Sequence, residues 1–221
     1  MNGLIARLSA FYGPLPHPPP DAFGVYLWEV LGLRTTSSRR DAALAALRRV
    51  PALTPDSLGK LGRGRLEAIV RLCGPLADER LRAIETGIDV FRRRHGIAAQ
   101  FDGPLSRAWI AARDLPQLGE GGAARLLLYA SPHGLVPVDE GLARLAVRLG
   151  LVRAVSRQRR LVRTVRRTLD EQLPRDLPAR RLAVLYLTHH AQHTCVEPDP
   201  HCGVCPISQD CPEGARRSAV S

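Results

Sequence analysis

Residues 115–151 read LPQLGEGGAARLLLYASPHGLVPVDEGLARLAVRLGL, and this stretch decides the fold class. Its first half opens on Leu-Pro and continues through three glycines, which predicts a tight turn between two helices. Apolar residues at helical spacing follow the turn, and a second break leads to Asp139 and another amphipathic segment. The stretch therefore predicts helices joined by short loops, and the helix after the turn begins with amides that can bind an anion.

The rest of the chain repeats this pattern and predicts an all-α protein. Leu, Ala and Arg dominate, short Gly or Pro breaks separate the segments, and convincing runs of alternating β-branched residues are absent. Residues Phe23–Leu33 are apolar nearly all round, which is typical of a buried helix. A proline-rich connector at residues 14–20 follows a short first helix. Further helices are expected at Arg39–Val50, Thr54–Leu61, Arg65–Leu72, Asp78–His95, Pro104–Ala112, Gly121–Tyr129, Asp139–Leu149, Ser156–Gln172 and Pro178–His190.

The length and the charge of the chain narrow its function classes. With 221 residues it forms one large or two small domains and can bury a core without a metal or disulfides. Its 32 basic and 21 acidic residues give a net charge of +11, which favours a polyanionic partner, nucleic acid first and an acidic membrane surface second. The apolar runs are too short for a membrane span, and the N-terminus lacks the pattern of a signal peptide. We therefore expect no membrane partner and a cytoplasmic location.

The basic residues are almost all arginine. The only lysine is Lys60, and because guanidinium groups stay protonated, a neutral amine is offered only by Lys60 and the α-amino group. Arginine is densest in Arg153–Arg167, which is either a solvated helix face or part of a phosphate-binding face.

Four of the five cysteines lie close together near the end of the chain. Their spacing is C-x6-C-x2-C-x5-C, and the residues between them are rich in Pro, Gly and Asp, which is typical of a loop wrapped around a bound group. A pair of disulfides, a zinc site and an iron–sulfur cluster are the alternatives, and clustering in one compact loop favours the iron–sulfur cluster. The four residues are Cys195, Cys202, Cys205 and Cys211, whereas Cys73 lies in an apolar segment and is typical of a buried thiol.

This cysteine spacing resembles the [4Fe–4S] loop of the endonuclease III family of DNA glycosylases. The preceding residues 189–194, HHAQHT, are also similar to that family's approach to its first cluster cysteine. The resemblance implies a [4Fe–4S] cluster that is chiefly structural and helps to present basic residues to DNA. Its implied ligands are Cys195, Cys202, Cys205 and Cys211.

The turn at residues 115–119 resembles the helix–hairpin–helix of the same family, whose form is L-P-G-x-G. Gln117 stands where the family has its first hairpin glycine, and the other positions of the turn match. The resemblance implies that backbone amides here bind DNA phosphates. The DNA-binding residues that it implies are Leu115, Pro116, Gln117, Leu118, Gly119, Gly121 and Gly122 in the hairpin, together with Arg34.

Residues 136–151 resemble the family's V-D-T-H-x-x-R-V-x-x-R-L-G-L segment, which carries its catalytic aspartate. Asp139 aligns with that aspartate, Arg144 and Arg148 match as well, and Glu140-Gly141 replace the Thr-His pair. From the sequence alone, Asp139 also fits the N-cap of the following helix. The two roles are compatible.

Two departures from the family pattern define the implied chemistry. Gly121 stands where bifunctional members have the lysine that forms a Schiff base, so the lyase step is expected to be weak or absent. Arg34 aligns with a glutamine that fills the gap left by the extruded base. The resemblance then implies a DNA glycosylase in which Asp139 assists the attack of water at a damaged or mismatched base. The alternative is a catalytically impaired DNA-binding or damage-sensing paralogue, which the departures at Gln117, Gly121 and Arg34 favour.

The resemblance also implies an architecture of two helical lobes with a DNA cleft between them. Residues 23–133 are expected to form a six-helix barrel that carries the hairpin. Residues 1–22 and 134–221 are expected to form the iron–sulfur cluster domain. We expect a monomer that acts on double-stranded DNA, associated with the nucleoid of a bacterial-type cell.

Overall fold

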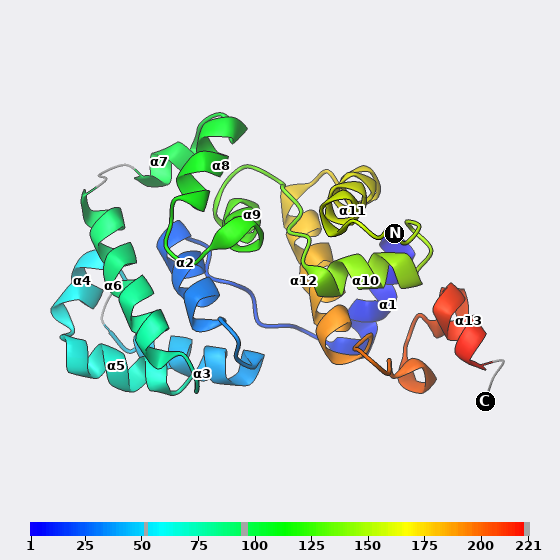
Figure 1. The fold of residues 1–221 in the computed structure, drawn as a ribbon, viewed down its shortest axis with the longest axis horizontal. Helices are drawn as coiled ribbons and strands as arrows, with labels where there is room; N and C mark the ends of the chain where they lie inside the picture. The colour runs from blue at the N-terminus through cyan, green and yellow to red at the C-terminus, as the bar shows by residue number, and fades with distance from the viewer. Residues whose placement is uncertain (51–52, 94–96, 219–221) are drawn as a thin grey trace. The chain divides into compact units, whose positions relative to one another are not determined.

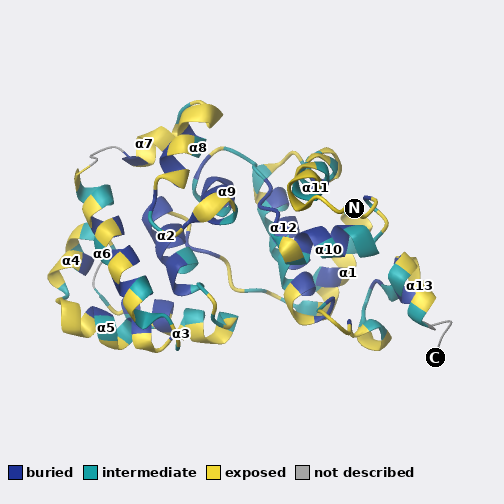
Figure 2. Cartoon of the chain, viewed as in Figure 1, coloured by how far each residue is buried: buried dark blue, intermediate teal, exposed yellow. Residues whose placement is uncertain are grey.

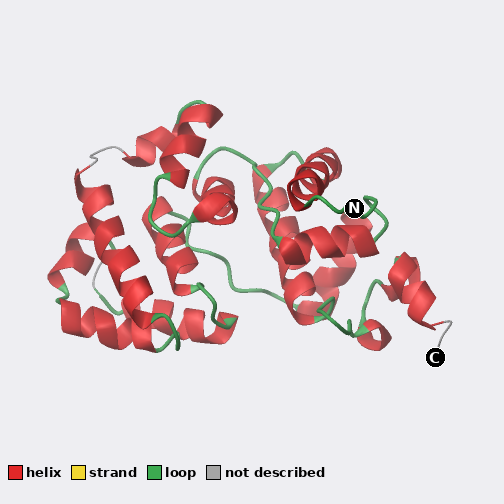
Figure 3. Ribbon diagram, in the orientation of Figure 1, coloured by secondary structure: helices red, strands yellow, loops and turns green. Residues whose placement is uncertain are grey.

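The structure is a computed structural model that describes residues 1–50, 53–93 and 97–218. Within these residues every regular element is a helix and none is a strand (Figure 3). The predicted all-α class is therefore confirmed. The chain divides into two compact units, Pro18–His133, and Met1–His17 together with Gly134–Ser221.

The unit Pro18–His133 is built around a buried helix, α2 (Ala22–Leu31). Asp21 caps it, because its carboxylate accepts a hydrogen bond of 2.8 Å from the amide of Gly24. Most of α2 is buried (Figure 2), as its apolar sequence predicts, and it packs against α3, α6 and α9. The other helices of this unit are α3 (Ser37–Leu47), α4 (Pro55–Lys60), α5 (Arg63–Arg71), α6 (Ala77–Arg93), α7 (Ile97–Asp102), α8 (Leu105–Arg113) and α9 (Gly119–Ala130), labelled in Figure 1.

Tyr26 shows how closely α2 packs against α6. Its side chain is fully buried, its hydroxyl donates to the carbonyl of Ala83 at 2.5 Å, and burial raises its pKa. A Cβ at Gly87 would lie 2.2 Å from Cε1 of the Tyr26 ring. We therefore expect Gly87→Ala to lower the free energy of unfolding by about 1–3 kcal/mol through overpacking, measured by urea denaturation. The control is Gly64→Ala, whose Cβ would meet nothing within 4 Å. An equal loss in both variants would contradict the packing argument.

The second unit is assembled from the two ends of the chain. Its central helix is α12 (Leu177–His193), which packs against α1 and α10, while α10 also packs against α11. Tyr186 of α12 donates to the carbonyl of Gly13 at 2.8 Å and so holds the N-terminal segment in place. The remaining elements of this unit are α1 (Asn2–Tyr12), α10 (Glu140–Arg148), α11 (Gln158–Gln172), the 3-10 turns η1 (Cys202–Val204) and η2 (Ser208–Asp210), and α13 (Pro212–Ser218).

Every helix expected from the sequence is present, with ends displaced by a few residues. α3 begins at Ser37, earlier than expected, because the Thr36 hydroxyl accepts a hydrogen bond from the Arg39 amide and caps the helix. The expected helix end at His95 lies outside the described residues. The short helices α7 and α13 were not predicted. In the described part of the chain, no helix has the length and apolar character needed to cross a membrane.

Candidate functional site

The hairpin turn between α8 and α9 has a left-handed residue, Gln117, at its third position. Gln117 has a φ of 63°, in the left-handed region, and the amide of Leu118 donates to the carbonyl of Leu115 at 3.4 Å. With Pro116 one position earlier, this is the pattern of a type II turn. Gln117 therefore takes the conformation that a glycine would favour there, at a cost of about 1 kcal/mol.

The hairpin exposes the backbone amides at the start of α9, which can bind an anion. Leu115 and Leu118 are buried and anchor the turn, whereas Gln117 and Gly119 are exposed. Leu118 occupies the N-cap of α9 and its side chain makes no cap hydrogen bond. The first amides of α9 are therefore available at the surface, where the helix dipole favours an anion.

Glu120 is a residue of this hairpin that the sequence reasoning did not single out. It lies in the first turn of α9, is exposed, and its carboxylate stands 3.8 Å from the guanidinium of Arg113 on α8. A carboxylate at a helix N-terminus stabilises the free helix. It also opposes a phosphate at the same amides, so the hairpin carries its own competing charge.

A buried ion pair lies directly behind the hairpin helix. Glu29 of α2 has a side chain only 9% exposed and accepts two hydrogen bonds from Arg125 of α9, at 2.6 and 2.9 Å. A Cβ at Gly122 would lie 3.1 Å from Glu29 Oε2, so Gly122 allows the carboxylate to approach α9. The sequence held a signal for this residue, because Glu29 is the only charged side chain in Phe23–Leu33.

Gly121 is the position that the sequence resemblance aligns with the Schiff-base lysine of bifunctional enzymes, and it has open space beside it. A Cβ at Gly121 would meet only the guanidinium nitrogens of Arg125, at 3.6 and 3.9 Å. Lys60 is the exposed last residue of α4, which packs against α6, whereas α9 packs against α2 and α8.

Arg34 lies in the turn that follows α2. It is exposed and has a φ of 44°, so the turn holds it in the left-handed region. The fully buried guanidinium of Arg80 donates to the carbonyls of Leu33 and Pro75, which joins this turn to the one after α5. The buried side chain of Arg80 therefore holds the turn that carries Arg34.

In the other unit, Asp139 is the N-cap of α10. Its Oδ1 accepts a hydrogen bond of 2.8 Å from the amide of Leu142, which confirms the capping role. Asp139 is half-buried. Gly141 lies beside it, since a Cβ there would stand 3.5 Å from Asp139 Oδ1 and 3.5 Å from the Cβ of Ala191.

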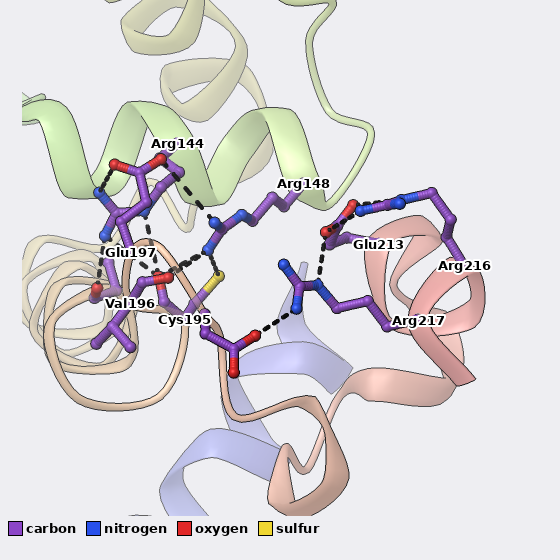
Figure 4. A network of polar contacts seen from close by, with 10 residues as sticks. Arg144, Arg148, Cys195, Val196, Glu197, Glu213, Arg216 and Arg217 are labelled. Atoms are coloured by element: carbon purple, nitrogen blue, oxygen red, sulfur yellow. Dashed lines mark hydrogen bonds and ion pairs between the residues drawn. The ribbon is translucent and has the colours of Figure 1, made fainter. Parts of the chain in front are cut away.

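The two arginines of the same segment face the cysteine loop (Figure 4). Arg148 donates to the carbonyls of Cys195 and Val196 at 3.1 and 2.8 Å, and to the sulfur of Cys195 at 3.4 Å. Arg144 donates to the carbonyl of Cys195 at 3.2 Å, and its guanidinium lies 3.6 Å from the carboxylate of Glu197. These arginines therefore fasten α10 to the start of the cysteine loop.

The four clustered cysteines lie in the loop between α12 and α13. Burial raises the pKa of the Cys205 thiol, and the charges of Cys211, Cys195 and Cys202 raise it further. All five cysteines are free thiols, so the disulfide alternative is not realised. Among the described residues, no group of three or more His, Cys, Asp or Glu side chains is arranged to hold a metal ion. The four predicted ligands therefore share one loop, and the described residues do not show them arranged as a metal site.

A polar network supports this loop from α1 and α12. The sulfur of Cys205 lies 3.7 Å from Nε2 of His190, and Nδ1 of the same ring lies 2.7 Å from the hydroxyl of Tyr12. Burial, with a smaller contribution from His189, lowers the pKa of His190 to about 4. The ring is therefore neutral near pH 7.

Removing the Arg148 anchor should loosen the cysteine loop. Arg148→Met leaves the carbonyl of Val196 without its charged donor and the carbonyl of Cys195 with Arg144 as its remaining donor, so we expect the free energy of unfolding to fall by about 1–3 kcal/mol. Thermal unfolding and limited proteolysis at residues 195–211 measure this. Arg175→Met, at an exposed position of the same unit, is the matched control. Proteolysis that is no faster in the Arg148 variant than in the control would contradict the anchoring role.

Comparison with known proteins identifies the fold. No family model matches the sequence, and no curated protein is significantly similar to it. A trapped covalent intermediate of endonuclease III with DNA is 19% identical with a TM-score of 0.70, over 98% of this chain and 96% of that one. A non-covalent endonuclease III–DNA complex is 20% identical with a TM-score of 0.71, over 99% and 96%. A thermostable thymine-DNA glycosylase is 17% identical with a TM-score of 0.71, over 97% and 96%. The chain therefore has the helix–hairpin–helix glycosylase fold that the sequence predicted.

Proposed function

We propose that this protein is a base-excision repair glycosylase of the endonuclease III type. It releases a damaged or mismatched base from double-stranded DNA and has weak or no lyase activity. The observation that carries the proposal is the match of nearly the whole chain to the endonuclease III and thymine-DNA glycosylase structures. The hairpin and Asp139 occupy the positions that the sequence resemblance assigns to DNA binding and catalysis. A monomer that acts on chromosomal DNA in the cytoplasm is part of the same proposal.

Asp139 is the catalytic residue of this proposal. As the glycosidic bond breaks, its electron pair leaves with the base and the sugar carbon becomes positively charged. The Asp139 carboxylate stabilises that charge and takes a proton from the water whose oxygen forms the new bond to the carbon. Its hydrogen bond from the Leu142 amide holds the carboxylate in one orientation.

The same residues explain why we propose hydrolysis alone. A Schiff base requires a neutral amine, and Gly121 supplies none at the family's lysine position.

The target base must leave the stack at a cost of a few kcal/mol. We assign to Arg34 the space that the base leaves, because its turn is fixed by Arg80.

The hairpin is the proposed contact with the DNA backbone. Its amides at the start of α9 receive a phosphate, and Gln117 keeps the turn open for it through its left-handed backbone. The positive net charge of the chain supplies the long-range attraction.

The four cysteines of the loop fit a [4Fe–4S] cluster by their chemistry. Four free thiols share one loop, and such a cluster takes four thiolate ligands. We propose Cys195, Cys202, Cys205 and Cys211 as these ligands. When bound, the cluster would supply cross-linking of the loop. The proposal predicts a brown protein with broad visible absorbance, and a colourless protein with stoichiometric zinc would overturn it.

The test of the proposed activity is alkali-dependent strand cleavage. The protein is incubated with duplexes that carry oxidised pyrimidines, uracil, alkylated bases or A/G mismatches, and each product is divided before treatment with hot alkali. Breaks that appear only after alkali support a glycosylase without lyase activity. Tight binding to these duplexes without breaks in any of them would instead support the non-catalytic, damage-sensing alternative.

Removing the competing charge of the hairpin should strengthen DNA binding. Glu120→Gln eliminates the carboxylate from the first turn of α9, and we expect duplex affinity to rise about 2- to 5-fold at low salt. Stability should change little, because the Arg113 contact is solvent-exposed. Fluorescence anisotropy with a labelled duplex measures the affinity. Glu79→Gln on α6 is the control for the change in net charge. An equal rise in duplex affinity in both variants would show that the change in net charge, and not the position of Glu120 in the hairpin, causes the effect.

A further inference from the structure

The helix α11 carries a face made of arginine. Arg159, Arg160, Arg163 and Arg167 are all exposed, and spacings of three, four and seven residues put them on one side of the helix. The opposite side holds the buried residues Val165 and Leu169. We call these four exposed arginines the α11 arginine face, and the helix that carries it is largely exposed in Figure 2.

In the part of the chain that the structure describes, none of the four arginines of this face forms an ion pair, and Glu171, four residues after Arg167, is the one exposed acidic residue of α11. The ion pairs of this unit engage other arginines, such as Arg144 with Glu197 and Arg180 with Asp170. Asp170 is the acidic residue nearest along α11 to the end of the face, and Arg180 already binds it at 2.9 Å. The arginine face therefore presents net positive charge to its surroundings.

The arrangement is unfavourable for the isolated helix. Arg159 and Arg163, and Arg163 and Arg167, are like charges four residues apart, which destabilises a helix by a few tenths of a kcal/mol for each pair. The first turn of α11 has no acidic residue, and its N-cap, Arg157, makes no side-chain cap hydrogen bond. Cations thus stand at the helix end where the dipole favours anions. A bound polyanion would relieve both effects.

The chemistry of the face favours a duplex backbone over a single strand. The segment from Arg153 to Gln172 contains no aromatic residue. Proteins that hold single strands combine positive charge with aromatic side chains on which bases stack. Guanidinium groups alone match the phosphates of a duplex, which need no stacking partner. The face extends over about 12 Å along the helix axis, and it can therefore meet several phosphates.

The arginine face is also tied to the segment that leads to Asp139. Nε of Arg166, which lies between two residues of the face, donates to the carbonyl of Val136 at 3.1 Å. Val136 stands three residues before Asp139. DNA held on α11 would therefore be held on the same unit, by a helix that directly contacts the approach to this carboxylate.

We propose that the α11 arginine face is a second binding surface for the phosphate backbone of duplex DNA, separate from the hairpin. It makes sequence-independent contacts, and it does not depend on base excision. Binding by this face can be measured even if the protein releases no base, so this proposal and the proposed glycosylase activity can fail separately.

The test compares two triple variants in binding to an undamaged duplex over a range of salt concentrations. Arg159→Gln/Arg163→Gln/Arg167→Gln removes three charges from the face. We expect its dissociation constant to rise at least about 10-fold at low salt and its salt slope to fall by about 2–3, since each phosphate contact contributes about 0.9. The control Arg48→Gln/Arg49→Gln/Arg82→Gln removes three exposed arginines from the other unit. Its affinity should change much less.

Further variants and probes keep the outcome decisive. Arg159→Lys/Arg163→Lys/Arg167→Lys keeps the charge and should retain most of the affinity. If the triple glutamine variant does not fold by circular dichroism, Arg163→Gln alone should still lower the salt slope by about 1. Equal losses in the α11 variant and the control, or an unchanged salt slope, would overturn the proposal. A larger loss for a single strand or for phosphatidylserine vesicles than for the duplex would also overturn it.

Discussion

Replacing Asp139 by asparagine is expected to slow base release by about 10²- to 10⁴-fold, the usual contribution of a general base. Asparagine cannot accept the proton of the attacking water, and it carries no charge to stabilise the sugar carbon in the transition state. It does keep the oxygen that accepts the hydrogen bond from Leu142, and asparagine is as good an N-cap as aspartate. Single-turnover excision with excess protein measures the rate at the chemical step.

The matched control for this variant is Asp176→Asn. Asp176 caps α12 in the same unit, where its carboxylate accepts a hydrogen bond of 2.9 Å from Ala179. The control makes the same chemical change at another helix cap, so it should leave the excision rate unchanged. If Asp139→Asn were as active as the unaltered protein, Asp139 would be a cap and nothing more.

Introducing a lysine at Gly121 is expected to create lyase activity in a chain for which we propose weak or no lyase activity. The Gly121→Lys variant should form a covalent complex with abasic or damaged duplex that borohydride traps, whereas the unaltered protein should form none. Space is available, because a Cβ there meets only the Arg125 guanidinium, at no less than 3.6 Å. The neutral form of the new amine is the nucleophile that would form the Schiff base. Denaturing gel electrophoresis after reduction measures the adduct.

Gly121→Arg is the control for the added charge and bulk. Guanidinium stays protonated and forms no Schiff base, so this variant should bind DNA without a trapped adduct. A robust adduct in the unaltered protein would show that Lys60 or the α-amino group reaches the sugar. A folded Gly121→Lys variant that binds DNA and yields no adduct would place Gly121 outside the reacting site.

The helices were predictable because their signals are local. Apolar periodicity and capping side chains act over a few residues, and Asp21 and Asp139 each cap the helix that follows them. The six- and seven-residue helices α7 and α13 are too short to display a period, which is why the sequence did not reveal them. Gln117 was predictable only in part. A glutamine in place of a glycine suggests a different turn, and only the structure shows that the residue keeps a left-handed backbone.

The candidate site was predictable only where its residues are neighbours in sequence. The hairpin and the cysteine spacing are continuous motifs, and the structure bears out the hairpin turn. The partners of Arg148 and Glu29 lie far along the chain, at Cys195 and Arg125, so their contacts depend on how helices pack. Local pattern carries no information about such pairs. The role of Arg148 as an anchor of the cysteine loop therefore emerged only from the coordinates.

The helix α10 joins two features of its unit, the Asp139 carboxylate at its start and the Arg148 contact with the cysteine loop at its end. Asp139 precedes its first residue, and Arg148, its last, grips the backbone of Cys195. A helix of nine residues is a rod about 13 Å long. The backbone of Cys195 and the carboxylate of Asp139 are therefore held at opposite ends of one helix. Under the proposed function, a substitution in the cysteine loop would act on base excision through α10, at a distance from Asp139.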